Sequence, residues 1–404
     1  MTTVHDVMGY RIVLNKTKVK RISVESAVNA GFLHETKETA GVNHLLEHVL
    51  TESWKKCGTS CSEFWNNRGV RMNASTDETI MMYYVKGLEE DLTEMVNYVA
   101  AITSHPIMRK SDVKKEKQAV IDELLTYGSD PASKLDHELN HLFFKNGLEF
   151  KDDWKLQIQN LKRLTLADLQ KTYRAEFTPS NVVFVVSGDF SKNAVLNLFR
   201  KSLTPSKKGV RLEADGFSLA HEIRFVHDSM ATTLVVLAVP SAVYSDSLLV
   251  QLASKILEMH LFTQLRTKRQ LVYGVHVNTA TTTCGTHLQF KIYVRPNNVV
   301  ECLRVLVSEV NKCMESFHPN LLLAAKKQFR QDFSVDVPDA EFYALQYVTS
   351  PDFIVSHDAL LHAYEKSTVN DVVDTIRQLI VWKHAACVYQ GQRNLNLTWD
   401  KIGL

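Results

Sequence analysis

The chain has 404 residues, of which 45% are hydrophobic and 23% charged, so it holds enough apolar material for two domains of about 200 residues each. Its 47 basic and 45 acidic residues leave a formal net charge of +2 with no polybasic block, which argues against a nucleic-acid or membrane partner recognised by charge. No stretch is apolar and long enough to span a bilayer, and we expect no secretory or transit signal at the start.

The six cysteines are sparse and follow no spacing typical of a disulfide scaffold. We therefore expect free thiols and a location in the cytoplasm or another reducing compartment. Cys57 and Cys61 lie four positions apart and could share one face of a helix. Because no second Cys or His pair lies nearby, ordinary thiols are expected there in preference to a zinc clip.

In chain order, the hydrophobic patterns predict a strand at 21–32, a helix that carries the sequence HLLEH, two strands within 70–87 and a helix at 88–106. Ser111 is placed to cap a further helix that runs to residue 127. The apolar run 181–190 then closes a first α+β unit with a strand.

The second half repeats this outline after a polar linker at 206–218, which contains Gly and shows no apolar period. Residues 230–246 correspond to the early strand of the first half, and residues 387–393 correspond to its closing strand. The pattern predicts an α+β fold of two homologous domains, 1–205 and 219–404, each with an antiparallel-rich sheet packed against helices.

His44-Leu45-Leu46-Glu47-His48 carries the first group of reactive side chains. Residues four apart stack on one face of a helix, so the two imidazoles could grip one metal ion. Glu47 shares that face, and a carboxylate beside a metal site can take a proton from an attacking water. The order is the reverse of the commoner HExxH motif. A solvated helix face with an ion pair is the alternative explanation.

A zinc site needs a further protein ligand, and the helix predicted at 111–127 offers Glu116 and Glu123. They are seven positions apart and therefore lie on one face, two turns from each other. Acidic residues beside an apolar stripe are also typical of an exposed helix surface, so the period alone leaves both possibilities open.

A second stretch, His137-Glu138-Leu139-Asn140-His141, is a literal HExxH motif and competes with the first as a zinc site. It lacks the longer continuation seen in some zinc peptidases, because Phe144 stands where that pattern requires Gly. Glu149 or Glu176 could serve as its third ligand.

The sequence resembles the pitrilysin or insulinase family of metallopeptidases, and in particular its short, two-domain branch of processing peptidases. That family has an HxxEH motif, a third zinc ligand Glu about 75 residues later and another Glu seven residues before it. The resemblance implies that His44, His48 and Glu123 bind one zinc ion per chain, with Glu47 as the general base. It also implies that Glu116 orients a ligand histidine.

Two further parts of the family pattern are present. Asn73 and Ala74, in the sequence MNAST, resemble an Asn-Ala pair on an edge strand to which substrate peptide adds as an extra strand. The segment from Leu265 to Val275 resembles the family's LRExxGLAYSV. The resemblance implies that Arg266 and Tyr273 hold substrate and stabilise the oxyanion of the tetrahedral intermediate.

The resemblance implies a zinc-dependent endopeptidase that acts on peptides or on presequence- or propeptide-like segments. Larger relatives have four such domains, with the zinc motif in the first and the Arg/Tyr pair in the fourth. A two-domain chain is therefore expected to form a homodimer or a heterodimer with a related subunit, with active sites shared between subunits. A non-catalytic scaffold or substrate-holding subunit of the same fold is the alternative.

Overall fold

The computed structural model describes residues 2–56, 58–143, 153–213, 221–241, 248–282, 285–335, 340–349 and 357–404. The chain forms two compact units, and neither is one continuous stretch of sequence. The first unit comprises Met1–Thr126, Asp153–Asp215 and Phe333–His357; the second comprises Tyr127–Asp152, Gly216–Asp332 and Asp358–Leu404. The sequence predicted a division at a single linker, into 1–205 and 219–404. In the structure, each unit also includes a segment that lies within the other half of the sequence.

The first unit is built on a six-stranded sheet with the order β1-β2-β6-β3-β5-β4. Strands β2 and β6 are parallel, and the other neighbours are antiparallel. The strand bounds are β1 Thr2–Val7, β2 Tyr10–Lys16, β3 Ile22–Val28, β4 Arg71–Thr76, β5 Met81–Gly87 and β6 Val182–Gly188.

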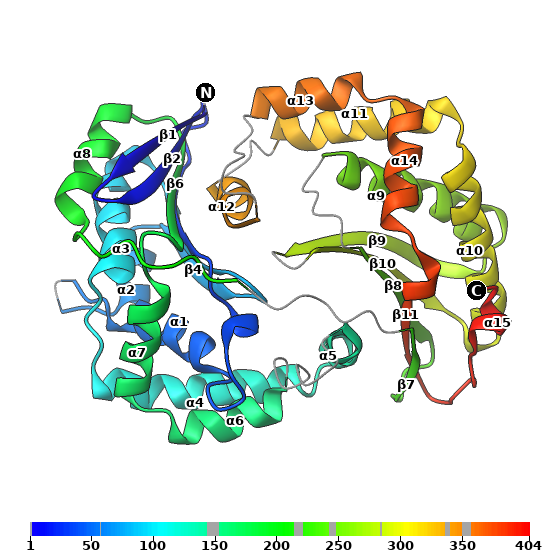
Figure 1. Cartoon of the computed structure of the whole chain (residues 1–404), viewed down its shortest axis with the longest axis horizontal. Coiled ribbons are helices and arrows are strands. Elements are labelled where there is room, and N and C mark those ends of the chain that lie inside the picture. The colour runs from blue at the N-terminus through cyan, green and yellow to red at the C-terminus, as the bar shows by residue number, and fades with distance from the viewer. Residues whose placement is uncertain are drawn as a thin grey trace. The chain divides into compact units, whose positions relative to one another are not determined.

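Helices cover both faces of this first sheet (Figure 1). On one face, Ile22, Val24 and Val28 of β3 join the main core beneath α3. On the other face, Ala27 joins a smaller core that α12 completes. The helices of the unit are α1 Val42–Ser53, α2 Cys61–Asn66, α3 Leu92–Ser104, α4 Lys110–Tyr127, α6 Trp154–Arg163, α7 Leu166–Glu176, α8 Lys192–Ser202 and α12 Ala340–Thr349.

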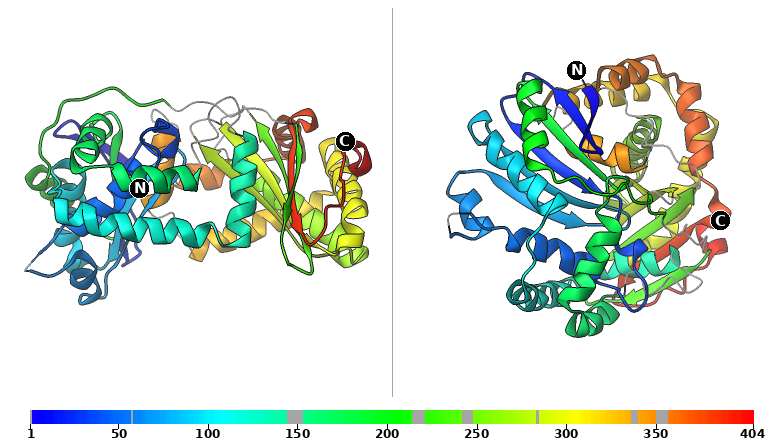
Figure 2. Two further views of the ribbon diagram at one scale, coloured as in Figure 1. Left: turned by 90° about the horizontal axis from the view of Figure 1, so that it is seen from below. Right: turned by 60° about the vertical axis from the view of Figure 1, so that its left-hand side comes forward.

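The second unit has a five-stranded sheet with the order β7-β11-β8-β10-β9, in which only β7 and β11 are parallel. The strand bounds are β7 Ile223–His227, β8 Thr233–Ser241, β9 Val272–Thr282, β10 Gly285–Val294 and β11 Ala386–Gly391. Its helices are α5 Pro131–Phe143, α9 Leu248–Leu261, α10 Val299–Glu315, α11 Pro319–Val335, α13 His357–Lys366, α14 Val369–Leu379 and α15 Trp399–Ile402. Helix α5 packs against β11, whereas α9 packs against β9 (Figure 2).

The two sheets share one topology once β1 is set aside. In each, the first strand pairs in parallel with the last, and the second, fourth and third strands follow. Strands β3 and β8 occupy equivalent places, as do β6 and β11, which confirms the predicted repeat and the α+β fold class. One detail was wrong: α4 begins at Lys110, so Ser111 lies inside the helix and does not cap it.

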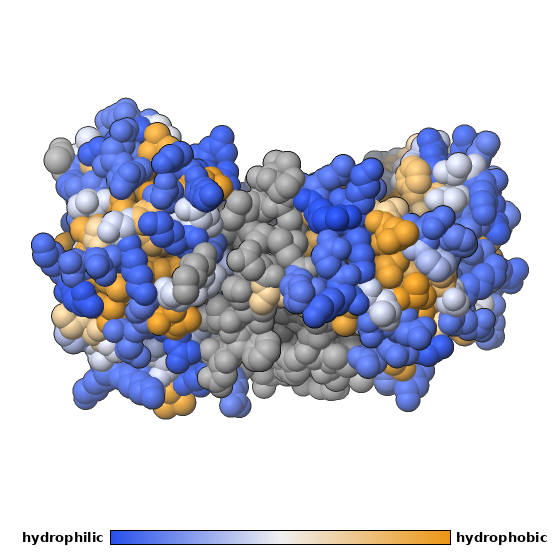
Figure 3. Space-filling model, turned by 90° about the horizontal axis from the view of Figure 1, so that it is seen from above, coloured by the Kyte–Doolittle hydropathy of each residue, from blue (hydrophilic) through white to orange (hydrophobic). Residues whose placement is uncertain are grey.

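The surface seen in Figure 3 is mainly hydrophilic where residues are described, with hydrophobic residues in small groups. Within the described ranges, no helix is both long and apolar enough to cross a membrane.

The described cysteines, Cys61, Cys302, Cys313 and Cys387, are free and buried. Burial raises the pKa of the Cys61 thiol to about 12, so this thiol is poorly suited to a zinc clip. Cys57 lies outside the described residues.

Candidate metal centre

Helix α1 carries the HLLEH sequence, and its first turn is fixed by a buried carboxylate. Glu35 accepts hydrogen bonds from the backbone N–H groups of Gly41 and Asn43, both at 2.8 Å. These are amides that a helix cannot satisfy internally, and a negative charge near the helix start is favourable. Gly41 precedes the helix with φ +93°, a left-handed conformation that glycine adopts without strain.

The structure brings together His44 and His48, whose four-residue spacing predicted a shared helix face, and Glu123, which the family resemblance implied. Each offers a ligand atom, and these atoms all lie within 4.8 Å of one another. Oε2 of Glu123 is 3.6 Å from Nε2 of His44 and 3.4 Å from Nε2 of His48. Atoms about 2.1 Å from one tetrahedral zinc ion lie roughly 3.4 Å apart, so the donor set fits zinc. Across the described part of the chain, no other group of three or more His, Cys, Asp or Glu residues meets this criterion.

The charges around His48 also suit a cation. Nδ1 of His48 is 3.2 Å from Oε2 of Glu116, a half-buried contact on the side away from Glu123. Burial lowers the pKa of His48, but its contacts with Glu116 and Glu123 more than reverse this and raise the pKa to about 9. At neutral pH His48 is therefore protonated on both ring nitrogens, and a bound cation would take the place of the proton on Nε2.

Glu47 points into the same region and is 8% exposed. Thr76, the last residue of β4, donates a hydrogen bond of 2.6 Å from its hydroxyl to Oε2 of Glu47. Burial raises the pKa of Glu47, while the nearby His44 and the Thr76 hydrogen bond lower it in part. A carboxylate with a raised pKa is a better proton acceptor near neutral pH, as a general base requires.

Asn73 and Ala74 lie on β4, which forms one edge of the first sheet. They pair with Tyr84 and Tyr83 of β5, so only the other side of β4 remains for an added strand. The hydrogen bond from Thr76 connects this edge strand directly to Glu47. A peptide added along β4 would therefore run toward the histidine and glutamate cluster.

Arg266 and Tyr273 lie together in the second unit. Arg266 belongs to the π-helix Phe262–Lys268, and its guanidinium lies 5.9 Å from the centre of the Tyr273 ring. It also donates a hydrogen bond of 3.0 Å to the carbonyl oxygen of Val272. Tyr273 is the extra residue of a β-bulge, because Val272 and Gly274 pair with successive residues of β10. π-Helices and bulges are common at functional sites because they redirect a side chain.

The competing HExxH motif lies on α5. The rings of His137 and His141 are 4.3 Å apart, but the carboxylate of Glu138 forms an ion pair of 2.7 Å with Arg224 of β7. Glu138 is thus held by a guanidinium and is poorly placed to serve as a base. Of its suggested third ligands, Glu176 is buried in the first unit, and Glu149 lies outside the described residues.

Sequence patterns did not reveal the residues that support this centre. Thr76 stands three positions after Asn73, yet nothing in that spacing indicates a contact with Glu47. The same holds for Glu35 and for Asp112, whose buried carboxylate accepts a hydrogen bond from Ser53 at the end of α1. Each contact depends on how a loop, a strand end or a second helix folds against α1, which hydrophobic periodicity does not encode.

The fold and this centre define a two-domain α+β protein with a His, His and Glu group suited to zinc. Residues 11–151 match the family described as insulinase, peptidase family M16, and residues 163–329 match its inactive domain. The chain therefore belongs to the insulinase, or pitrilysin, family, as a member with one domain of each kind.

Several known proteins are similar to the chain in sequence or in structure. The chain is 26% identical over 197 residues to the uncharacterized zinc protease YmxG of Bacillus subtilis, which covers 46% of each chain. It is 22% identical over 259 residues to human mitochondrial cytochrome b-c1 complex subunit 1, covering 62% of this chain and 53% of that protein. The match thus spans about half the length of each of these relatives. A protease structure from Helicobacter pylori superposes with a TM-score of 0.82 at 17% identity, covering 96% of this chain and 99% of that one.

Proposed function

We propose that the chain is a zinc-dependent endopeptidase that hydrolyses peptides or presequence- and propeptide-like segments. The observation that carries this proposal is the cluster of His44, His48 and Glu123 with the buried Glu47 beside it. His44, His48 and Glu123 would hold one zinc ion. When bound there, zinc lowers the pKa of water and polarises a carbonyl group.

The remaining steps belong to the chain's own residues. The β4 edge, with Asn73 and Ala74, would hold the substrate backbone as an added strand. Glu47 would take a proton from the attacking water and return it to the leaving amine. Arg266 and Tyr273 would donate to the oxyanion that forms at the scissile carbonyl. Because strand addition reads the backbone, we expect broad tolerance of substrate sequence.

Metal analysis and a single substitution test the proposal. The purified chain should hold one zinc ion, and Glu47→Gln should keep that zinc while reducing peptide hydrolysis at least a hundredfold. The amide of Gln packs like the carboxylate but cannot accept the proton. Retention of more than a few per cent of activity in Glu47→Gln would contradict this role.

The two histidine motifs provide a matched comparison. His44→Ala should lose zinc or bind it far more weakly, because it removes one of three protein ligands. His137→Ala removes the first histidine of the HExxH sequence and should leave zinc binding unchanged. If zinc follows His137, the assignment of the metal centre is wrong.

A non-catalytic role is the second candidate, and the similarity to cytochrome b-c1 complex subunit 1 favours it. A scaffold or substrate-holding subunit would need neither zinc nor a general base. A chain that folds, contains no zinc after supplementation and hydrolyses no peptide would support this alternative.

A further inference from the structure

The three candidate ligands and the supporting Glu116 come from two helices that the sequence places far apart. His44 and His48 lie on α1, whereas Glu116 and Glu123 lie on α4. Their relative position must therefore be fixed by contacts between the helices. A shift of one residue along a helix is about 1.5 Å, whereas distances at metal sites hold to about 0.2 Å.

The two helices are joined by a series of side-chain pairs, each of which we call a rung. Starting from the end with the candidate metal ligands, His44 faces Glu123 and His48 faces Glu116. Further along, Lys115 forms an ion pair of 2.8 Å with Glu52. The last rung joins Ser53, at the C-terminal end of α1, to Asp112 in the first turn of α4. The order of the rungs shows that α1 and α4 run antiparallel.

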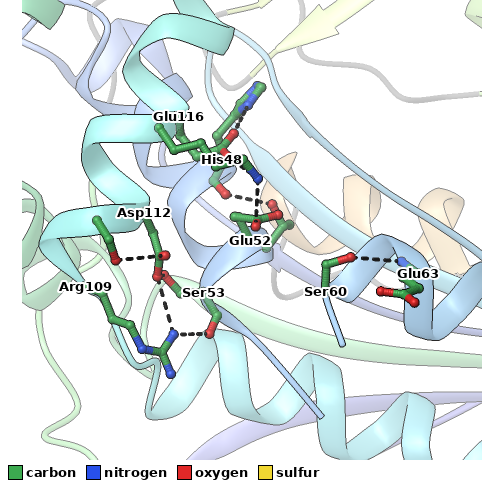
Figure 4. A network of polar contacts seen from close by, with 11 residues as sticks. His48, Glu52, Ser53, Ser60, Glu63, Arg109, Asp112 and Glu116 are labelled. Carbon is green, nitrogen blue, oxygen red and sulfur yellow. Dashed lines mark hydrogen bonds and ion pairs between the residues drawn. The ribbon is translucent and has the colours of Figure 1, made fainter. Parts of the chain in front are cut away.

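The last rung is a polar group in which Ser53, Arg109 and Asp112 contact one another, and Asp112 also accepts a hydrogen bond of 3.3 Å from the Ser111 hydroxyl (Figure 4). The Ser53 hydroxyl donates to Oδ2 of Asp112 at 2.9 Å. Nη1 of Arg109 donates to the Ser53 carbonyl oxygen at 2.7 Å and to the same Asp112 oxygen at 3.3 Å. Ser53 is 2% exposed and Asp112 5% exposed. The hydrogen bond between Ser53 and Asp112 is buried, whereas the Arg109 side chain is partly exposed. A buried hydrogen bond fixes geometry more firmly than an exposed ion pair such as Lys115–Glu52 does.

We propose that Ser53, Arg109 and Asp112 form a helix clamp that sets the register of α4 against α1 and thereby tunes zinc affinity. These are positioning residues, because they act through Glu116 and Glu123 and contact no ligand atom themselves. The Arg109 guanidinium matches the buried charge of Asp112 and also satisfies a terminal carbonyl of α1. The inference rests on the zinc site of the proposed function, but not on the hydrolysis.

The test is zinc affinity of the full chain, measured by competition with a chromogenic chelator. Ser53→Ala and Asp112→Asn should each weaken zinc binding about tenfold, the lower end of effects seen when support of a metal ligand is lost. The double variant should lose less zinc-binding free energy than the sum of the losses in the two single variants, because each substitution removes the same contact. The matched control is Glu52→Gln, which breaks the exposed rung and should change affinity less than twofold.

Thermal stability of the metal-free variants is measured in parallel. A contact that only stabilises the fold would lower the melting temperature and leave zinc affinity of the folded chain unchanged, and that result would overturn the clamp. If Asp112→Asn fails to fold, Ser53→Ala decides alone. Wild-type chain that binds zinc without hydrolysing peptides would refute the proposed peptidase and leave the clamp standing. Wild-type chain that binds no zinc would overturn both.

Discussion

Glu176 is a buried carboxylate behind the start of α1, close to the HLLEH sequence. It is the last residue of α7 and is 8% exposed. Burial, together with the negative charge of Glu35, raises its pKa to about 8, and a hydrogen bond with the Asn43 side chain only partly opposes this. The folded protein therefore holds a proton on Glu176 that the unfolded chain releases above about pH 4.5.

This linkage gives a prediction for Glu176→Gln. The contribution of Glu176 to stability is fully present below about pH 4.5 and is lost as pH rises toward 8, because the folded-state pKa is the higher one. Gln keeps the shape and cannot ionise, so the melting temperature of the variant should fall less between pH 5.5 and pH 8 than that of wild type. Glu315→Gln, at an exposed position in α10, is the control and should follow wild type. Parallel profiles for Glu176→Gln and wild type would contradict the assignment.

Gln270 stands between Arg266 and Tyr273 with φ +54°, a left-handed conformation unfavourable for residues with a Cβ atom. In the family pattern LRExxGLAYSV this position is Gly. Such a conformation costs about 1–3 kcal/mol in a non-glycine residue, whereas glycine adds about 0.5–1 kcal/mol of unfolded-state entropy. The strain should therefore exceed the entropy.

We expect Gln270→Gly to stabilise the protein by up to about 1 kcal/mol. Gln328→Gly is the matched control, because Gln328 is exposed within α11 and glycine there should destabilise by about 1 kcal/mol. Denaturant titration of both variants measures the two effects. Equal destabilisation by the two substitutions would show that Gln270 is not strained.

At this scale the sequence predicted the residues that share a helix face and missed those that meet across the fold. His44 and His48 followed from a four-residue spacing, and Glu123 required the family resemblance as well. Thr76 and Glu35 could not be found, because a strand end and a loop reach α1 only after folding.

At the scale of elements, the two sheets differ at their equivalent edges. Strand β4 ends the first sheet, and β9 ends the second. At β9 the helix α9 satisfies both backbone groups of Val277: Glu258 accepts from its N–H at 3.0 Å, and the Ser254 hydroxyl donates to its carbonyl at 2.6 Å. Because both backbone groups of Val277 are already hydrogen-bonded, another strand cannot pair with β9 at that residue.

The protected edge can be tested by hydrogen exchange. Glu258→Ala removes the acceptor of the Val277 amide, so that amide should exchange about fivefold faster, as expected for loss of about 1 kcal/mol of hydrogen bonding. Lys255→Ala changes the same helix without touching this bond and should leave the exchange rate of Val277 unchanged. Equal rates in wild type and Glu258→Ala would mean that α9 does not protect this edge.

Hydrophobic periodicity predicted most elements, including the strands β3 and β8 at equivalent places in the two sheets. It left the start of α4 to capping chemistry, which placed a cap at Ser111, although the amides of Asp112 and Val113 hydrogen bond to the carbonyl of Arg109. It could not predict that α5 and α12 belong to units other than those of their sequence neighbours. Such an exchange depends on packing between distant segments and leaves no local signal.

At the scale of the whole molecule, the resemblance to four-domain relatives leads to a prediction about assembly. If each active site combines Glu47 of one subunit with Arg266 of another, Glu47→Gln and Arg266→Ala homodimers should both be nearly inactive. A mixed dimer would hold one site with both defects and one with neither. Random exchange of equal amounts makes about half the dimers mixed, so activity should recover to about a quarter of wild type.

The measurement is peptide hydrolysis after the two variants are mixed and re-equilibrated. Subunit exchange must be shown separately, for example by energy transfer between labelled chains. A mixture that exchanges and remains as inactive as its parents would mean that each site is completed within one chain.

The position of α12 also has a consequence for synthesis of the protein. Helix α12 packs over the face of the first sheet formed by residues such as Ala27, Val183 and Val185. The last strand of that sheet, β6, ends at Gly188, yet α12 begins only at Ala340. At roughly 5–20 residues per second, the ribosome needs about 8–30 s to make the intervening chain. For that interval an apolar sheet face is without its own cover, which makes the nascent chain a natural client for chaperones that bind hydrophobic surface.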